Sequence, residues 1–274
     1  MIRVERWFDD VVYASWMTQR LLEAHQASSA ILVEFGLEDA KVVGSAGGID
    51  HANVMVLVES PDGRQTIRVH ASEASEARVR SEIYWLSRLG ERISVKVPEP
   101  LIGLDGSQMQ TAQIDAGDRL CTAYSWLPGV RLAEEMEQPS AMIASIGRAL
   151  AEIHMCGTSP EVPQWFSRPE YDVSTTAGAE SLSGDDAQLV ALQESGQSYG
   201  LIHRELGHHN ILVDAQEGVS FIDFTTLGWG FFVHDIGTVV RGLREDQWDV
   251  FFEAYQSVRA LPAAELKWID DRLP

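Results

Sequence analysis

The sequence has few lysines and few cysteines, and it has no long hydrophobic run. Lysine occurs only at Lys41, Lys96 and Lys267, so a mechanism that requires a catalytic lysine has few candidates. The two cysteines, Cys121 and Cys156, lack the paired spacing of a disulfide framework or a zinc site, which fits a reducing compartment. No run approaches the roughly 20 apolar residues of a membrane helix, and the first residues lack the apolar core of a signal peptide. We therefore expect a cytoplasmic protein with no membrane partner.

Positive charge is also scarce. The 274 residues include 41 acidic and 21 basic side chains, which gives a net charge of -20 at pH 7. A nucleic-acid partner requires a basic footprint, so this balance argues against one. An acidic protein attracts cationic small molecules more readily than anionic ones. Two interpretations stay open here: a preference for a cationic substrate, or an acidity that serves solubility alone.

The order of predicted elements indicates an α+β fold. Hydrophobic spacing predicts a helix over residues 16–35 that ends at Gly36, a hairpin of two strands around a turn at 60–63, and a helix over 73–89. Further along are a predicted strand over 120–127, a helix over 140–155, a loop over 157–183 and a short helix over 185–196. Strands dominate first and helices later, with a Pro-Gly break at 128–129 between them. We expect two lobes, residues 1–124 and 125–274.

Polar side chains interrupt apolar runs in the segment 201–224. Glu205 and Asn210 lie in its first polar cluster, and Asp223 follows Asn210 by 13 residues. A loop held between two short strands would bring these three residues around one point. Asparagine and aspartate supply the hard oxygen ligands that magnesium prefers, and a second carboxylate can accept a proton from a hydroxyl. This set suits phosphoryl transfer. The alternative is that Asn210 and Asp223 only cap backbone groups of a loop and a turn.

Three short runs carry a resemblance to a known family. The run 203–210, His-Arg-Glu-Leu-Gly-His-His-Asn, resembles the kinase catalytic loop His-Arg-Asp-Leu-x-x-x-Asn. The run 222–224, Ile-Asp-Phe, resembles the magnesium site that follows it, and 229–236 is similar to the Gly-x-x-x-x-Asp-Leu/Ile element. The combination resembles the aminoglycoside phosphotransferases and their choline, homoserine and fructosamine kinase relatives. Their common pattern is His-Gly-Asp-Leu-His-Pro-Gly-Asn followed by Ile-Asp-Phe.

The resemblance implies a bilobal, protein-kinase-like fold with an antiparallel sheet in the first lobe, a mainly helical second lobe, and roles for five residues. Glu205 occupies the position of the catalytic aspartate, and Asn210 and Asp223 would hold magnesium. His203 and Asp235 would brace the catalytic loop without transferring protons. A metal site made by the histidines at 203, 208 and 209 is the alternative, but no cysteine or helical His-x-x-x-His spacing supports it.

The resemblance also implies a nucleotide site in the first lobe, and the ordered match runs over roughly residues 20–245. It includes a glycine loop over the phosphates, a strand cation with its helix partner, and a hinge whose backbone would contact adenine: Gly47, Gly48, Arg68, Glu82, Tyr124 and Trp126. ATP and magnesium are the implied cofactors, and a small-molecule hydroxyl is the implied acceptor. Two glycines alone also fit a plain turn, and Arg68 with Glu82 also fits a surface salt bridge.

The sequence departs from the family pattern at two functional positions. Glu205 carries its carboxylate one methylene further out than aspartate, and a misplacement of about 1 Å can cost on the order of a hundredfold in rate. Arg68 stands where the family has a strand lysine; arginine stays charged and can bind phosphate bidentately, but it is bulkier. The chain also ends at Pro274, where family members usually continue with helices around the substrate pocket. We expect either a truncated chain or an open pocket.

Two functions from different classes fit these residues. The first is an ATP- and magnesium-dependent phosphotransferase that moves the γ-phosphoryl group to a hydroxyl of a small, amine-bearing molecule, such as an aminoglycoside or a related metabolite. The second is a catalytically weak pseudokinase that binds nucleotide in a regulatory role, and its motivation is Glu205. The sequence leaves the acceptor and the oligomeric state open.

Overall fold

The structure of the chain is a computed structural model, and it describes residues 18–47, 53–135, 137–171, 197–215 and 218–271. The chain forms two compact units. The first consists of Met1–Arg80 with Glu99–Trp126, and the second of Ser81–Pro98 with Leu127–Pro274. Across the described ranges, no helix has both the length and the apolar character needed to cross a membrane.

Residues 81–98 group with the second unit, whereas the division based on sequence places them in the first lobe. Hydrogen bonds explain this grouping. The main-chain N–H of Ser94 binds the carboxylate of Glu152, and the carbonyl of Lys96 accepts from the N–H of Phe221 at 2.9 Å. These contacts tie the end of the segment to elements that follow residue 127.

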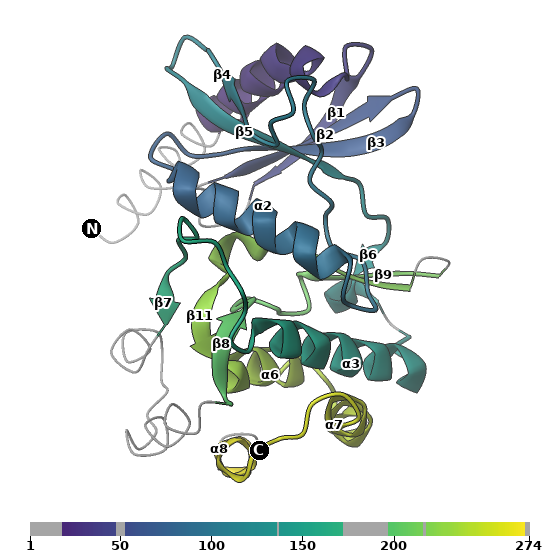
Figure 1. The fold of residues 1–274 in the computed structure, drawn as a ribbon. Coiled ribbons are helices and arrows are strands. Elements are labelled where there is room, and N and C mark those ends of the chain that lie inside the picture. The colour runs from purple at the N-terminus through teal and green to yellow at the C-terminus, as the bar shows by residue number, and fades with distance from the viewer. Residues whose placement is uncertain (1–17, 48–52, 136, 172–196, 216–217, 272–274) are drawn as a thin grey trace, which may run out of the picture. The chain divides into compact units, whose positions relative to one another are not determined.

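The first unit is built on a five-stranded antiparallel sheet with the strand order β1-β2-β3-β5-β4 (Figure 1). Its strands are β1 (Lys41–Gly47), β2 (Val54–Ser60), β3 (Gly63–Val69), β4 (Gln110–Ala112) and β5 (Arg119–Ser125). A helix over residues 18–31 and the 3-10 turn η1 (Val33–Phe35) precede the sheet. Gly36 then ends the helical segment with a φ of 67°, as the sequence predicts.

The hairpin of β2 and β3 confirms the predicted turn at residues 60–63. Ser60 lies opposite Gly63, and Gly63 has a φ of 123°, which only glycine adopts readily. Alternate residues of β2 face the core: Val54, Val56 and Val58 are all buried. The helix over 18–31 packs its apolar residues into the same core, which fixes the sheet in place.

The second unit contains most of the helices and two small sheets (Figure 1). Its helices are α3 (Ser140–Gly157), α6 (Phe232–Val240), α7 (Trp248–Gln256) and α8 (Ala263–Asp270), and α2 (Glu76–Gly90) spans the boundary between the units. One sheet has the order β10-β9-β6, with β6 (Val130–Arg131), β9 (Ile211–Asp214) and β10 (Gly218–Phe221). The other has the order β7-β11-β8, with β7 (Glu170–Tyr171), β8 (Tyr199–Ile202) and β11 (Gly228–Phe231). Short 3-10 turns complete the unit: η2 (Leu132–Glu134), η3 (Phe224–Thr226) and η4 (Glu245–Gln247).

The helical period that predicted α3 is confirmed by its burial. Ile143, Ile146, Leu150 and Ile153 are fully buried, and α3 packs against α7 through this apolar surface. Together with the antiparallel sheet of the first unit, these helices confirm the α+β fold class. The predicted helix over 185–196, and the loop beyond residue 171, lie outside the described residues.

Candidate active site

The segment 203–210 connects β8 to β9, as the sequence predicts. Both strands are short and largely buried, because their apolar residues belong to the core of the second unit. β9 pairs with β10 in antiparallel fashion, with Ile211 opposite Phe221. The end of the loop and the residues that follow β10 therefore come together, which brings Asn210 beside the main chain next to Asp223.

Asn210 joins the loop 203–210 to the residues that follow β10. Its Nδ2 donates to the carbonyl of Glu205 at 2.8 Å, and its own carbonyl accepts from the N–H of Ile222 at 2.9 Å. The side chain is buried, with 6% of the residue exposed. Because the amide nitrogen is used in this way, Oδ1 is the atom of Asn210 that remains to ligate a cation.

Glu205 is more open than the residues around it. Its side chain is 45% exposed, and its Oε1 lies 3.5 Å from Nη1 of Arg204. The N–H of Gly207 donates to the carbonyl of Glu205 at 2.7 Å, which turns the loop back on itself. A carboxylate in this position is reachable by a small molecule and can accept a proton.

Asp223 follows β10 in a left-handed conformation, with φ 63° and ψ 69°. Its Oδ1 accepts a hydrogen bond from the hydroxyl of Thr225 at 2.6 Å, so the carboxylate is oriented by the turn that follows it. Non-glycine residues adopt this backbone conformation rarely, and at functional sites the surrounding structure holds them there.

Two residues from the segment before β8 hold the turn after Asp223. Arg168 donates to the carbonyls of Leu227 at 2.6 Å and Thr225 at 2.5 Å, and the hydroxyl of Tyr171 donates to the carbonyl of Thr226 at 3.0 Å. Sequence reasoning missed both residues. They lie in the stretch 157–183, which the sequence predicts to be a loop, and no periodic pattern there marks them out from their neighbours.

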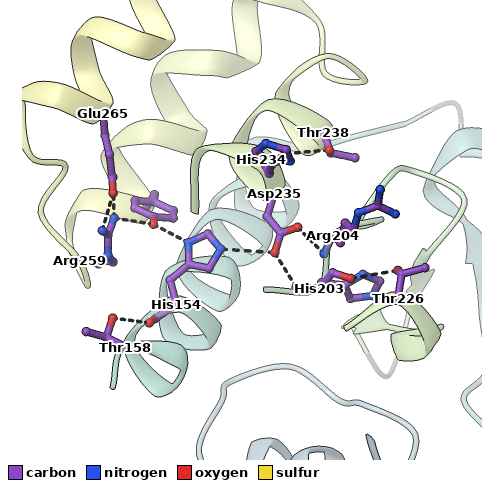
Figure 2. A network of polar contacts seen from close by, with 11 residues as sticks. His154, Thr158, His203, Arg204, Thr226, His234, Asp235, Thr238, Arg259 and Glu265 are labelled. Atoms are coloured by element: carbon purple, nitrogen blue, oxygen red, sulfur yellow. Dashed lines mark hydrogen bonds and ion pairs between the residues drawn. The ribbon is translucent and has the colours of Figure 1, made fainter. Parts of the chain in front are cut away.

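Asp235 fixes the start of the loop 203–210 (Figure 2). Its Oδ2 accepts from the N–H of His203 at 2.8 Å, and its Oδ1 accepts from the N–H of Arg204 at 2.7 Å. The aspartate is fully buried near the start of α6. Burial alone would raise the pKa of Asp235, but the hydrogen bonds donated by His154 and by the main chain of His203 lower it below its usual value. The buried carboxylate is therefore ionised and holds two consecutive main-chain amides.

His203 contacts the residues that follow β10, on both sides of Asp223. Its Nε2 lies 2.9 Å from the carbonyl of Ile222, and since a carbonyl only accepts, Nε2 carries the proton. Its carbonyl accepts from the hydroxyl of Thr226 at 3.2 Å, and its ring packs against Phe224. His203 thus connects the loop 203–210 to residues on both sides of Asp223.

A chain of buried polar contacts extends from Asp235 to the last two helices (Figure 2). Nε2 of His154 lies 3.5 Å from Oδ2 of Asp235, and Nδ1 of His154 lies 2.7 Å from the hydroxyl of Tyr255. That hydroxyl also accepts from Arg259 at 3.0 Å. Burial lowers the pKa of His154, so the ring is neutral, accepts from Tyr255 and donates to Asp235. Sequence reasoning missed this network because its hydrogen bonds join residues up to 101 positions apart.

The residues expected to bind nucleotide fall in different parts of the structure. Arg68 lies on β3, is 4% exposed, donates from Nε to the sulfur of Met55 at 3.4 Å and stands 5.2 Å from the ring centre of Tyr124. Tyr124 is itself buried on β5. Gly47 ends β1, whereas Gly48 lies outside the described residues.

Glu82 and Trp126 complete this set. Glu82 is buried on the part of α2 that belongs to the second unit, and its carboxylate lies 4.0 Å from Nη1 of Arg168. Trp126 is the last residue of the first unit, and 38% of its surface is exposed. The pairing of Glu82 with Arg68, and the contact of the 124–126 backbone with adenine, stay predictions.

Comparison with known proteins places the chain in a family. Residues 44–266 match the profile of the phosphotransferase enzyme family, which covers most of the chain. The chain therefore belongs to this family and is a phosphotransferase. It is 26% identical to the homoserine kinase of Neisseria meningitidis over 251 residues, which make up 83% of this chain and 77% of that protein.

Two solved structures share the fold. A microcompartment-associated aminopropanol kinase is 24% identical, with a TM-score of 0.67 over 87% of this chain and 82% of that one. An amicoumacin kinase, solved with AMP-PNP and Ca²⁺, is 18% identical, with a TM-score of 0.68 over 96% of this chain and 84% of that one. These likenesses confirm the kinase-like α+β fold that the sequence motifs predicted.

Proposed function

We propose that this phosphotransferase uses ATP and magnesium to phosphorylate a hydroxyl of a small, amine-bearing molecule. The observation that carries the proposal is the position of Asn210, which binds the main chain at Glu205 through its side chain and at Ile222 through its carbonyl. One proton acceptor and two hard oxygen ligands thereby belong to one connected loop system. Phosphoryl transfer requires mainly such positioning together with charge neutralisation.

The donor atoms fit magnesium. Oδ1 of Asn210 and the carboxylate of Asp223 are hard oxygens, and the Thr225 hydroxyl orients that carboxylate. Within the described ranges, no group of three or more His, Cys, Asp and Glu side chains is arranged to hold a metal ion. The remaining ligands would therefore be water and phosphate oxygens, which magnesium commonly retains. When bound, the ion would neutralise charge on the phosphates.

Glu205 would act on the acceptor. Its exposed carboxylate would accept the hydroxyl proton as the acceptor oxygen bonds to the γ-phosphorus and the bond from that phosphorus to the leaving ADP oxygen breaks. His203 and Asp235 would keep the loop in place through their main-chain and ring hydrogen bonds. Because these braces touch no reacting atom, their role is positioning.

The nucleotide would be held mainly by the first unit. Arg68 is a fixed cation on the sheet and would bind phosphate oxygens, with Glu82 as its partner. Gly47 and Gly48 would allow the backbone to approach the phosphates closely. The backbone over residues 124–126 would contact adenine.

Charge and relatives both support an amine-bearing acceptor. The net charge of -20 favours cations over anions near the protein. Homoserine and aminopropanol, the alcohols named for two similar kinases, each carry an amino group together with a hydroxyl. The acceptor itself has to be identified by measuring activity with a panel of alcohols.

The direct test is an ATP-consumption screen with magnesium and a panel of acceptors: aminoglycosides, choline, homoserine, aminopropanol and related alcohols, with products checked for the mass of an added phosphate. We expect turnover of at least one amine-bearing alcohol. Asp223→Ala should reduce kcat by about 10² to 10³-fold, since the metal contribution is worth several kcal/mol. The matched control is Asp246→Ala, which removes an exposed carboxylate paired with Arg244 in the same unit. It should leave the rate unchanged.

The outcomes separate the two functions. If magnesium-ATP raises the melting temperature of the wild type but no acceptor is phosphorylated, the chain binds nucleotide without catalysis. If Asp223→Ala and Asp246→Ala retain equal turnover, the assignment of the metal site to Asp223 is wrong.

A further inference from the structure

Arg204 has a backbone conformation that its residue type disfavours. Its φ is 74°, one of three positive values at non-glycine positions in the described residues, and it lies directly before Glu205. Residues with a Cβ atom are disfavoured in this region by steric contact with the main chain, whereas glycine enters it freely. The hydrogen bond from the N–H of Arg204 to Asp235 holds the conformation. A large side chain kept at such a position needs a compensating role.

The side chain of Arg204 lies on an aromatic platform. Its guanidinium carbon is 4.2 Å from the centre of the Tyr171 ring, a close cation–π contact. The platform is itself fixed, because Tyr171 lies on β7, pairs with Gly230 of β11, and donates its hydroxyl hydrogen to the Thr226 carbonyl at 3.0 Å. The guanidinium therefore has a defined location.

From this location Arg204 contacts Glu205. Nη1 of Arg204 lies 3.5 Å from Oε1 of Glu205. Side chains of consecutive residues diverge in helices and point to opposite faces in strands. Here they converge, in a loop whose left-handed turn falls on the first of the two residues. The unusual φ and the ion pair thus occur at the same point of the chain.

The contact matters because glutamate is longer and more mobile than aspartate. Its extra rotatable bond adds rotamers that must be restricted before the carboxylate can meet a hydroxyl. An ion pair with a 45% exposed carboxylate is weak, so it can bias the orientation without preventing the carboxylate from turning to an acceptor. The ion pair therefore restricts the rotamers of Glu205 and adds little to stability.

We propose that Arg204, held on the Tyr171 ring, is a positioning residue that orients the carboxylate of Glu205 for the acceptor hydroxyl. This role rests on the proposed function. Arg204 and Glu205 then act together, because the arginine restricts the additional rotamers that the extra methylene gives to the glutamate. The dependence is testable because shortening residue 205 should remove the need for Arg204.

The experiment is a double-mutant cycle, with kcat, both KM values and the melting temperature measured for an acceptor found in the screen. Arg204→Gly should lower kcat by about two- to fivefold, as expected when a weak, exposed ion pair that biases the orientation is lost, while the KM values of acceptor and ATP stay within about 1.5-fold. In a Glu205→Asp background, the same change should alter kcat by less than about 1.5-fold, since the shorter carboxylate does not depend on the guanidinium. Arg148→Ala, which removes an exposed arginine on α3, is the control.

Tyr171 supplies a second arm. Tyr171→Phe removes the hydrogen bond to the Thr226 carbonyl but keeps the ring, so it is the reference for Tyr171→Leu. Relative to Tyr171→Phe, Tyr171→Leu should lower kcat in the same direction as Arg204→Gly, and this difference should disappear in an Arg204→Gly background, because the ring acts through the arginine. Tyr171→Phe, which keeps the ring face, should retain more activity than Tyr171→Leu.

Three results would overturn the proposal: an unchanged kcat in Arg204→Gly, an equal loss with Glu and with Asp at position 205, or a loss that appears in the KM values or the melting temperature. A wild type without turnover is a different result. It refutes the proposed function, and the positioning role with it, before any variant is compared.

Discussion

The buried histidine His70 makes the stability of the first unit depend on pH. His70 follows β3, is 3% exposed, and its Nε2 lies 3.1 Å from the hydroxyl of Thr122. Burial first, and then the positive charge of Arg68, lowers the pKa of His70 to about 3. The folded state therefore keeps His70 neutral at a pH where the unfolded chain binds a proton.

The sign of the effect follows from this difference. Because the pKa of His70 is lower in the folded state than the ordinary value of 6.5, its contribution to stability is complete above pH 6.5 and is lost as the pH falls toward about 3. The slope for one histidine is at most about 1.4 kcal/mol per pH unit. We expect His70→Gln to lose less stability than the wild type between pH 7.5 and 5.

Urea unfolding at several pH values measures this slope. His209→Gln is the matched control, since His209 is exposed in the second unit and its removal should leave the slope as in the wild type. A wild-type slope that His70→Gln does not reduce would show that folding does not lower the pKa of His70.

Among the elements, the last two helices are joined by a buried ion pair. Arg259, just after α7, makes two hydrogen bonds to Glu265 of α8, at 2.7 and 2.8 Å, and a third to the carbonyl of Gln197 at 2.6 Å. Glu265 is fully buried, and Arg259 is 6% exposed. Tyr255 and His154 continue the chain of contacts to Asp235. Through these contacts, α7 and α8 support Asp235 and, with it, the loop 203–210.

Removing one member of this pair should be costly. Glu265→Ala leaves the guanidinium of Arg259 buried without its partner, and breaking a buried pair in this way costs about 3–5 kcal/mol in the free energy of unfolding. Lys267→Ala breaks the exposed pair of Lys267, on α8, with Asp271, which directly follows that helix, and this should cost about 0–1 kcal/mol. Denaturant unfolding of both variants gives the comparison. Equal losses would mean that the buried pair has no special role.

The same elements show what local sequence signals predict and what they leave out. The apolar period of α3, the turn at 60–63 and the polar loop between β8 and β9 follow from neighbouring residues, so they were predicted correctly. The hydrogen bonds of Arg168 to the turn after Asp223 join residues 57 and 59 positions apart. Arg259 donates to the carbonyl of Gln197, which is 62 positions away. Such contacts depend on how the helices and strands pack, and a single sequence has no local pattern that reports them.

For the chain as a whole, the charge of -20 sets a background field that the active site shares with the rest of the surface. If the acceptor carries an ammonium group, this field raises its concentration near the protein and lowers its apparent KM. Salt screens the attraction, since the Debye length falls from about 10 Å at 0.1 M to about 3 Å at 1 M. The attraction should therefore be visible as a dependence of KM on ionic strength.

We expect the KM of a cationic acceptor to rise by about three- to tenfold between low and high sodium chloride, because screening removes a long-range attraction of several kT. Magnesium-ATP keeps a net negative charge, so its KM should hold or fall over the same range as its repulsion is screened. The opposite response of the two substrates makes the measurement internally controlled, since a general loss of activity in salt would change kcat or move both values together. An acceptor KM that is independent of salt would show that the acidity serves solubility and plays no part in substrate capture.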